Sequence, residues 1–289
     1  MFWQLKILAK IVLSRLPIRY GSFKRLGIFR SGRMDEPAYA WSVFRRHCAH
    51  AGLTESLAGA TVLEFGPGDS LLTALFARAL GARRTYLVDA ADLAGRDLGP
   101  FRAAQDLLRA EGYAPPEIPQ DGSMEQVLSA LEAVYLPEGA KALARIPTAS
   151  VDFVFSQAVL EHVRAAEFDH VLRELRRIMC DGAIASHRVD LRDHLAGALN
   201  NLRFSASVWE SDFMARSGFC TNRIRFSDML ERMKAAGFAV EVIGVDRWAR
   251  LPTPRGRLKA PFRDLPDSEL CVSGFDVLMR PVRAGAAAA

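Results

Sequence analysis

Thr61-Val62-Leu63-Glu64-Phe65-Gly66-Pro67-Gly68-Asp69-Ser70 is the segment around which the rest of the chain can be arranged. It begins as a short apolar run and ends in a turn that contains two glycines. Residues 71–80 follow with apolar side chains at helical spacing, and Thr85-Tyr86-Leu87-Val88-Asp89 is a second apolar run that ends in an acid. This order predicts a strand, a helix and a second strand of one parallel sheet.

The turn between the first strand and the helix has the features of a ligand site. Gly66 and Gly68 lack a Cβ atom, so the backbone can turn sharply there and approach a bound molecule closely. The helix that follows directs its unpaired N–H groups into the same crevice. Asp89, at the carboxyl end of the second strand, can accept hydrogen bonds from both hydroxyls of a ribose.

Two ribose-containing ligands compete for this site. A dinucleotide site needs G-x-G-x-x-G, but Leu71 stands where the third glycine would fall. The carboxylates of Glu64 and Asp69 would also repel a pyrophosphate. They suit S-adenosylmethionine instead, which carries a ribose, an amino group and a cationic sulfonium. An NAD-dependent enzyme on a related fold is the less favoured alternative.

Two motifs resemble those of the class I S-adenosylmethionine-dependent methyltransferases. The segment from Val62 to Asp69 resembles the first motif of that family. Val151-Asp152-Phe153-Val154-Phe155-Ser156-Gln157-Ala158-Val159-Leu160-Glu161-His162-Val163 is similar to its fourth-strand motif. The resemblance covers roughly residues 60–280. The alternative is a Rossmann-like domain whose glycine loop only makes a turn.

The resemblance implies an α/β fold, a Rossmann-like seven-stranded, mostly parallel sheet with helices on both faces. It also implies S-adenosylmethionine as the cofactor. Ala133-Val134-Tyr135-Leu136 reads as the third strand, and the family commonly places an acid after it, against the adenine amino group; Glu138 is the nearest one here. We expect cofactor contacts from Glu64, Gly66, Pro67, Gly68, Asp69, Ser70, Asp89, Ala90, Glu138, Ser156 and Gln157.

The charge of the chain is unevenly distributed. The 289 residues have a formal net charge of +5, but residues 1–33 hold eight Lys and Arg side chains and no acid, which leaves −3 for the rest. This argues against a broad phosphate-binding surface, so we expect no nucleic-acid partner. We interpret residues 1–35 as a basic extension and residues 36–289 as the methyltransferase domain, with an insertion at 190–225.

The N-terminal extension is amphipathic. Its apolar residues between Phe2 and Leu16 are interrupted by Lys6 and Lys10, so it is too short to span a bilayer, which needs about 20 apolar residues. No signal-peptide cleavage site follows. Residues 1–33 either lie on an anionic membrane surface or pack on the protein, for example in a homodimer. The four scattered cysteines fit a cytoplasmic protein, peripheral on the inner membrane face under the first reading.

A polar cluster follows the expected fifth strand, Ala183 to Ser186. It contains His187, Asp190, Asp193 and His194. His187 oriented by Asp190 can remove a hydroxyl proton during methyl transfer, and this is our first candidate for the base. The four residues can alternatively bind a divalent ion or cap a helix, and we assign no metal site. His162, in the fourth-strand motif, is the second candidate base.

The acceptor is the least determined part of the reading. Tyr39 and Trp41 lie in a predicted helix and either line the pocket or pack in the core, which is the more common role of such residues. The insertion offers hydrogen-bonding and aromatic groups for an acceptor: Asn200, Asn201, Arg203, Trp209, Glu210, Asn222 and Arg223. These suggest O-methylation of a polar acceptor such as a cell-surface glycan or lipid-linked sugar. The alternatives are O- or N-methylation of a quinone or other small metabolite, and a non-catalytic cofactor-binding protein.

Overall fold

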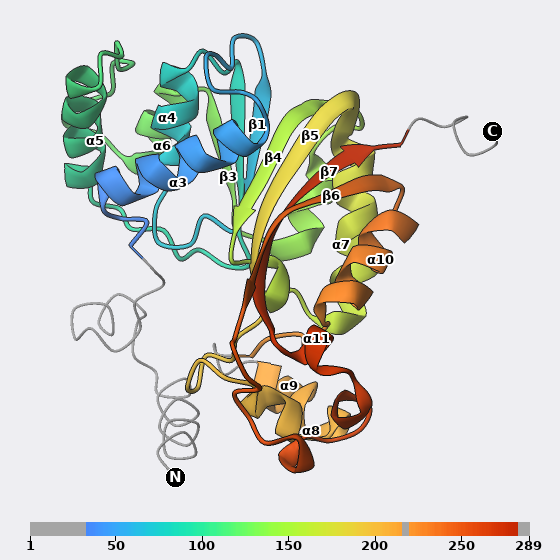
Figure 1. The fold of residues 1–289 in the computed structure, drawn as a ribbon. Coiled ribbons are helices and arrows are strands. Elements are labelled where there is room, and N and C mark those ends of the chain that lie inside the picture. Colours follow the sequence, from blue (N-terminus) through green and yellow to red (C-terminus); the bar gives the residue numbers. More distant parts are fainter. Residues whose placement is uncertain (1–32, 216–219, 283–289) are drawn as a thin grey trace. The chain divides into compact units, whose positions relative to one another are not determined.

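The computed structural model describes residues 33–215 and 220–282. They form a seven-stranded sheet of order β3-β2-β1-β4-β5-β7-β6, in which β7 is antiparallel (Figure 1). The strands are β1 (Thr61–Phe65), β2 (Arg84–Val88), β3 (Ala133–Leu136), β4 (Val151–Gln157), β5 (Met179–Asp190), β6 (Phe238–Arg247) and β7 (Val272–Pro281). The predicted Rossmann-like fold of a class I methyltransferase is confirmed.

Helices alternate with the parallel strands, as a right-handed crossover between such strands requires. The α-helices are α3 (Pro37–His50), α4 (Thr73–Ala79), α5 (Gly99–Ala110), α6 (Met124–Ala130), α7 (Ala165–Ile178), α8 (Ala206–Trp209), α9 (Asp212–Ala215), α10 (Phe226–Ala235) and α11 (Asp267–Leu270). Short 3-10 helices are η1 (Gly139–Arg145), η2 (Leu160–His162), η3 (Asn200–Arg203), η4 (Arg255–Arg257) and η5 (Phe262–Asp264). Among the described residues, none of these helices is long and apolar enough to cross a membrane.

The chain divides into two compact units. Of the described residues, the glycine-loop unit contains 33–157, 174–187 and 278–282. The insertion unit contains 158–173, 188–215 and 220–277. Strands β5 and β7 and helix α7 each contribute residues to both units. The predicted membrane or dimer contact of residues 1–33 falls almost entirely outside the described residues.

Strand β1 lies at the centre of the glycine-loop unit. It pairs in parallel with β2, placing Glu64 opposite Leu87, and with β4, placing Glu64 opposite Phe155. All five β1 residues are buried, as expected of a strand covered on both faces. At the start of β1, the Thr61 N–H donates to Asp152 Oδ2 over 2.8 Å. This bond connects the beginning of β1 to the beginning of β4.

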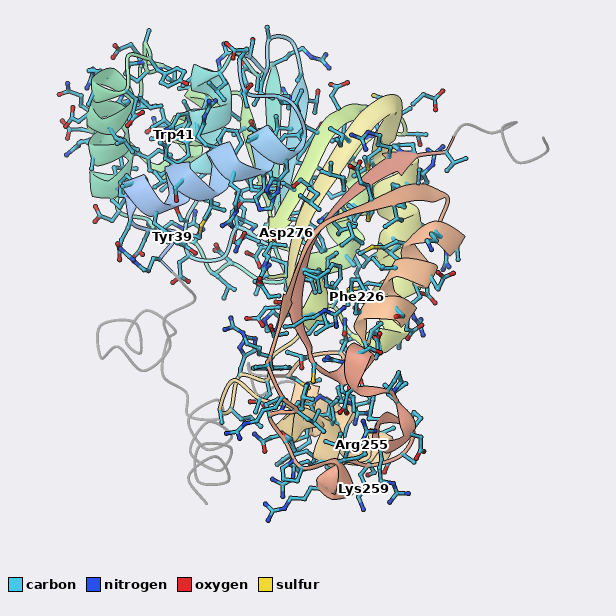
Figure 2. The ribbon with its side chains drawn as sticks, in the orientation of Figure 1. Tyr39, Trp41, Phe226, Arg255, Lys259 and Asp276 are labelled. Carbon is cyan, nitrogen blue, oxygen red and sulfur yellow. The ribbon has the colours of Figure 1, made fainter. Side chains whose placement is uncertain are left out.

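Helix α3 covers the core of this unit and packs against α4 and α5 (Figure 1). Its Trp41 lies 5.1 Å from Phe76 and 5.4 Å from Tyr113 between ring centroids, and it is buried. Trp41 is therefore a core residue, the more common of its two predicted roles. Tyr39, at the beginning of the same helix, is half-buried and carries the Arg33 guanidinium 5.5 Å from its ring centroid (Figure 2).

Many polar side chains of the insertion unit bond to groups of the same unit. Trp209 Nε1 donates to the Thr221 carbonyl over 2.8 Å, and Asn201 Nδ2 donates to Thr221 Oγ1 over 3.0 Å. Asn222 Nδ2 donates to the Leu160 and Val163 carbonyls. Arg223 pairs with Glu210 at 3.0 Å. Several side chains that we expected to bind an acceptor therefore connect α8 and η2 to residues 221–223. Arg255 and Lys259 lie in the excursion between β6 and β7 (Figure 2).

Candidate functional site

The glycine loop after β1 has a backbone that only glycine adopts without strain. Gly66 and Gly68 have φ angles of 81° and 64°. The Gly66 N–H donates to the Val88 carbonyl over 2.8 Å, so the loop lies beside the carboxyl end of β2. A Cβ atom built on Gly68 would have no atom within 4 Å. The space above the loop is therefore open, and the φ angle alone requires glycine at this position.

Asp89 sits directly beneath this loop. Its Oδ2 accepts the Gly68 N–H and its Oδ1 accepts the Ala90 N–H, each over 2.6 Å. Each carboxylate oxygen has a second lone pair, so both ribose hydroxyls can still be bound. Burial raises the pKa of Asp89, and these backbone bonds oppose the shift. The bonds also fix the carboxylate in position before a ligand arrives, as the predicted role requires.

Glu64 is the buried acid of the glycine loop. Its side chain is 1% exposed, and Oε2 has no hydrogen-bond partner among the described residues. Desolvation raises its pKa to about 8, Asp89 adds to the shift, and a hydrogen bond from Thr73 opposes it. Asp69, Ser70 and Pro67 are buried nearby in the sequence. A buried acid with an unused oxygen beside an open glycine loop fits a ligand that brings a positive charge, because such a charge would favour the ionised form of Glu64.

The carboxyl end of β4 carries a network that the sequence analysis missed. Gln157 Oε1 accepts Arg46 Nη2 over 2.7 Å and His47 Nε2 over 3.2 Å. Since an amide oxygen only accepts, His47 carries its proton on Nε2, and its Nδ1 accepts the Ser186 hydroxyl over 2.8 Å. Burial lowers the pKa of His47 to about 3, so the ring is neutral. The network leaves the NH2 group of Gln157 as its donor toward a ligand.

His187 and Asp190 each have a partner other than the one we expected. Both lie inside β5, which is longer at both ends than residues 183–186. His187 Nδ1 is 2.7 Å from Ser156 Oγ, both residues are fully buried, and desolvation lowers the pKa of His187 to about 4. Asp190 instead accepts the backbone N–H, Nε and Nη2 of Arg192. The predicted His187–Asp190 hydrogen bond is therefore not formed.

His162 and His194 form a pair in the insertion unit. Their rings are 7° from parallel with centroids 4.8 Å apart, and their Nε2 atoms are 3.0 Å apart. His162 Nδ1 must donate to the Cys220 carbonyl at 3.1 Å, so His162 Nε2 accepts and His194 Nε2 donates. When the His194 ring is neutral, its Nδ1 is the nitrogen that carries no proton. Although part of His162 reaches solvent, desolvation and then His194 lower its pKa below the ordinary value.

Asp193, another member of the predicted cluster, has structural partners. Its Oδ1 accepts the N–H groups of Leu195 and Ala196, and its Oδ2 accepts that of Asn200, so it holds a turn in place rather than capping a helix. Among the described residues, no group of three His, Cys, Asp or Glu side chains could hold a metal ion.

Glu138 follows β3 as expected, but its carboxylate pairs with Arg145 at 2.5 Å and is exposed. The next residue, Gly139, donates its N–H to the Asp89 carbonyl over 2.7 Å, so this segment does lie beside the end of β2. Contact of Glu138 with adenine stays a prediction.

The family of the chain follows from a comparison with known domains. The sequence profile of the methyltransferase domain matches residues 41–243, more than half of the chain. The chain belongs to this methyltransferase family. It is an S-adenosylmethionine-dependent enzyme, which confirms the predicted class and cofactor. The open glycine loop, Asp89 and the unsatisfied Glu64 fit that cofactor, which supplies an electrophilic methyl group on a sulfonium.

Several solved structures are similar to this methyltransferase. The YcgJ protein of Bacillus subtilis is 15% identical, with 82% of this chain and 97% of that chain covered and a TM-score of 0.46. An S-adenosylmethionine dependent methyltransferase of Mesorhizobium loti is 16% identical, with 80% and 94% covered and a TM-score of 0.43. A 1,6-didemethyltoxoflavin-N1-methyltransferase of Burkholderia thailandensis is 13% identical, with 96% and 89% covered and a TM-score of 0.45. No curated protein sequence matches this chain.

Proposed function

We propose that this methyltransferase methylates a hydroxyl oxygen of a polar acceptor such as a cell-surface glycan or lipid-linked sugar. The observation that carries the proposal is the His162–His194 pair, in which the Cys220 carbonyl fixes the tautomer of His162 and so makes His194 Nε2 the donor of the bond between the rings. A hydroxyl acceptor loses its proton as the methyl group is transferred, so it gains from a positioned base. An amine acceptor, which reacts in its neutral form, needs no such group.

An ionised Asp190 would stabilise the positive charge that forms when the His162–His194 pair takes up a proton. Burial opposes the ionisation of Asp190, but the hydrogen bonds and the charge of Arg192 hold its pKa below the ordinary value. An ionised Asp190 in turn favours the imidazolium that forms when His194 takes a proton. The proposal keeps Asp190 in the assisting role predicted from the sequence, with His194 in place of His187. His187 is sealed from solvent and bonded to Ser156, which suits a structural role.

The surroundings of His162 suit a small polar group. A cavity of about 40 Å³ lies beside His162 and is also lined by Arg164, Trp209 and Glu210. A cavity of this size is large enough for a hydroxyl group, since about 10 to 15 Å³ is enough for one water molecule. Arg164 and Glu210 provide charged donors and acceptors of the kind that recognise sugar hydroxyls. The bulk of the acceptor would remain outside this cavity, as for a long glycan or lipid-linked chain.

In the proposed donor site, Asp89 binds the ribose, Glu64 and Asp69 favour the cationic end of the cofactor, and Gln157 donates from its amide. Most of the rate would come from holding cofactor and acceptor in line. The residues of the donor site belong to the glycine-loop unit, and the histidine pair belongs to the insertion unit. The proposal therefore rests on the chemistry of each unit by itself, and kinetic measurements test whether the two act together. The alternatives are a quinone or other small metabolite as acceptor and a non-catalytic cofactor-binding role.

The test combines an acceptor screen with a matched histidine series. Transfer of labelled methyl from S-adenosylmethionine is measured with lipid-linked sugars, short glycans, quinols and amines. On the best acceptor, His194→Asn should lower kcat by about 10²- to 10⁴-fold, the usual range for a lost base, and leave S-adenosylhomocysteine affinity unchanged. His170→Asn, on the exposed side of α7, is the control.

Full turnover by the His194→Asn variant would remove the pair from the mechanism. A preference for amines with no dependence on His194 would favour N-methylation. Tight cofactor binding with no transfer to any acceptor would favour the non-catalytic alternative.

A further inference from the structure

A second hollow lies in the glycine-loop unit, at the edge of the sheet opposite the glycine loop. Its volume is about 610 Å³, and we call it the arginine hollow. It is lined by Arg78, Arg83, Arg84, Thr61, Tyr86 and Ser150, together with Glu132 and Pro147. Thr61 begins β1 and Arg84 begins β2, whereas the glycine loop follows the other end of β1. The hollow is therefore separate from the donor site.

Each arginine of the hollow is held in place by one bond of its own. Arg78 Nη1 donates to the Ala82 carbonyl over 3.1 Å, and Arg83 Nη2 donates to Thr61 Oγ1 over 3.0 Å. Arg84 Nη2 lies 3.4 Å from Glu132 Oε2, a long contact. A guanidinium has five N–H donors in a planar fork. These contacts orient the three forks while using a small part of their donor capacity.

The charge of the lining is strongly one-sided. Three guanidinium groups face one carboxylate, Glu132, whose side chain is 50% exposed. Asp152, which accepts the Thr61 N–H, adds a second carboxylate close by, so the three arginines remain in excess. This concentration of positive charge stands within a catalytic body that is mildly acidic outside residues 1–33. Positive charges gathered around one concavity repel one another, and a bound anion would relieve that repulsion.

We propose that the arginine hollow binds a small molecule that carries two or more phosphate groups. Planar guanidinium forks match phosphate oxygens in bidentate fashion, and several of them together favour a multiply charged anion. The hydroxyls of Thr61 and Tyr86 add hydrogen-bonding groups of the kind that phosphate oxygens accept from. The volume falls within the range of about 300 to 1,000 Å³ that is usual for small-molecule sites. The phosphates belong to a soluble metabolite or to a lipid headgroup.

The direct test is calorimetric titration of the full chain with phosphate, pyrophosphate and tripolyphosphate at low ionic strength. We expect affinity to rise with the number of phosphates. Arg83→Gln combined with Arg84→Gln should weaken tripolyphosphate binding by about 100-fold, from the loss of two charge-assisted contacts. The control is Arg102→Gln combined with Arg109→Gln, which removes the same charge from the exposed face of α5.

Two readouts keep the result decisive. Neither double variant touches the donor site, so both should bind S-adenosylhomocysteine as the wild type does, which also shows that they are folded. If the Arg83/Arg84 variant does not fold, Arg78→Gln takes its place. No binding of any probe by the wild type, or an equal loss in both double variants, would overturn the proposal. Sedimentation with vesicles that contain phosphatidic acid, with and without pyrophosphate as competitor, separates a lipid source from a soluble one.

Discussion

Replacing Glu64 with glutamine should remove a defined part of the pH dependence of stability. Glu64 is fully buried, and desolvation, with a contribution from Asp89, raises its pKa from 4.5 to about 8. The folded state therefore retains a proton that the unfolded state loses near pH 4.5. The stabilisation from Glu64 is complete at low pH and is lost as the pH rises through about 8. Glutamine imitates the protonated acid and does not titrate.

The magnitude follows from the size of the shift. One pKa unit corresponds to about 1.4 kcal/mol, so Glu64 should cost the wild type about 2 kcal/mol between pH 6.5 and about pH 8.5. Glu161 has the same raised value of about 8, mainly from desolvation and then from Asp190, and should contribute a similar loss. The buried His47 and His187 have folded-state pKa values of about 3 and 4, so over this range they titrate only in the unfolded state, near 6.5; this adds a smaller change of opposite sign that the wild type and the glutamine variants share.

The assay is urea unfolding at three pH values across this range, followed by tryptophan fluorescence and by circular dichroism. The wild type should lose about 4 kcal/mol of unfolding free energy, and Glu64→Gln and Glu161→Gln should each lose about 2 kcal/mol. Glu111→Gln, an exposed substitution at the end of α5, controls for the exchange itself. If the free energy of unfolding changes with pH by the same amount in Glu64→Gln and in the wild type, Glu64 does not have the raised pKa that its burial predicts.

Two further changes test the networks that hold the site. His47→Phe should lower the free energy of unfolding by about 1 to 3 kcal/mol, because it leaves Ser186 and Gln157 without their buried partner; the exposed Ser42→Ala is the control, and equal stability of the two variants would exclude the network. Asn222→Ala removes two bonds to the carbonyls of Leu160 and Val163, which flank His162, and should cost about 2 to 4 kcal/mol by urea unfolding. A kcat that falls more than the stability explains would show that Asn222 also positions His162, whereas an unchanged protein would contradict both roles.

The sequence predicted the glycine loop well because its signals are local. Two glycines between an apolar run and a helix specify positive φ angles, and both Gly66 and Gly68 adopt them. Asp89 could be placed because an acid at the carboxyl end of a parallel strand has few other locations. The buried pattern of β1 likewise follows from its continuous apolar run.

The partners of the histidines could not be predicted in this way. Ser156 and His187 meet because their strands lie side by side in one register, and hydrophobic patterning does not specify that register between polar residues. His47 looked like one more member of the buried face of a helix. The presence of a histidine in that apolar face was the signal that His47 has buried hydrogen-bond partners. Which residues these partners are depends on how α3 lies over β4 and β5.

The insertion shows a different limit. Asn201, Trp209 and Asn222 look like acceptor-binding groups when they are read one at a time. In the structure they bond to carbonyls and hydroxyls of their own unit, because a segment with little regular structure must satisfy its buried backbone groups through side chains. A list of polar residues therefore overestimates how many are available to a substrate.

The most direct measurement is calorimetric titration with S-adenosylhomocysteine of the wild type, Asp89→Asn and the exposed control Asp92→Asn. The account predicts micromolar binding by the wild type and the control. It predicts about 100-fold or greater weakening in Asp89→Asn, because charge-assisted bonds to two ribose hydroxyls are lost. Equal affinity in all three proteins, or tighter binding of NAD than of S-adenosylhomocysteine by the wild type, would contradict the assignment of the donor site to the Gly66–Gly68 loop.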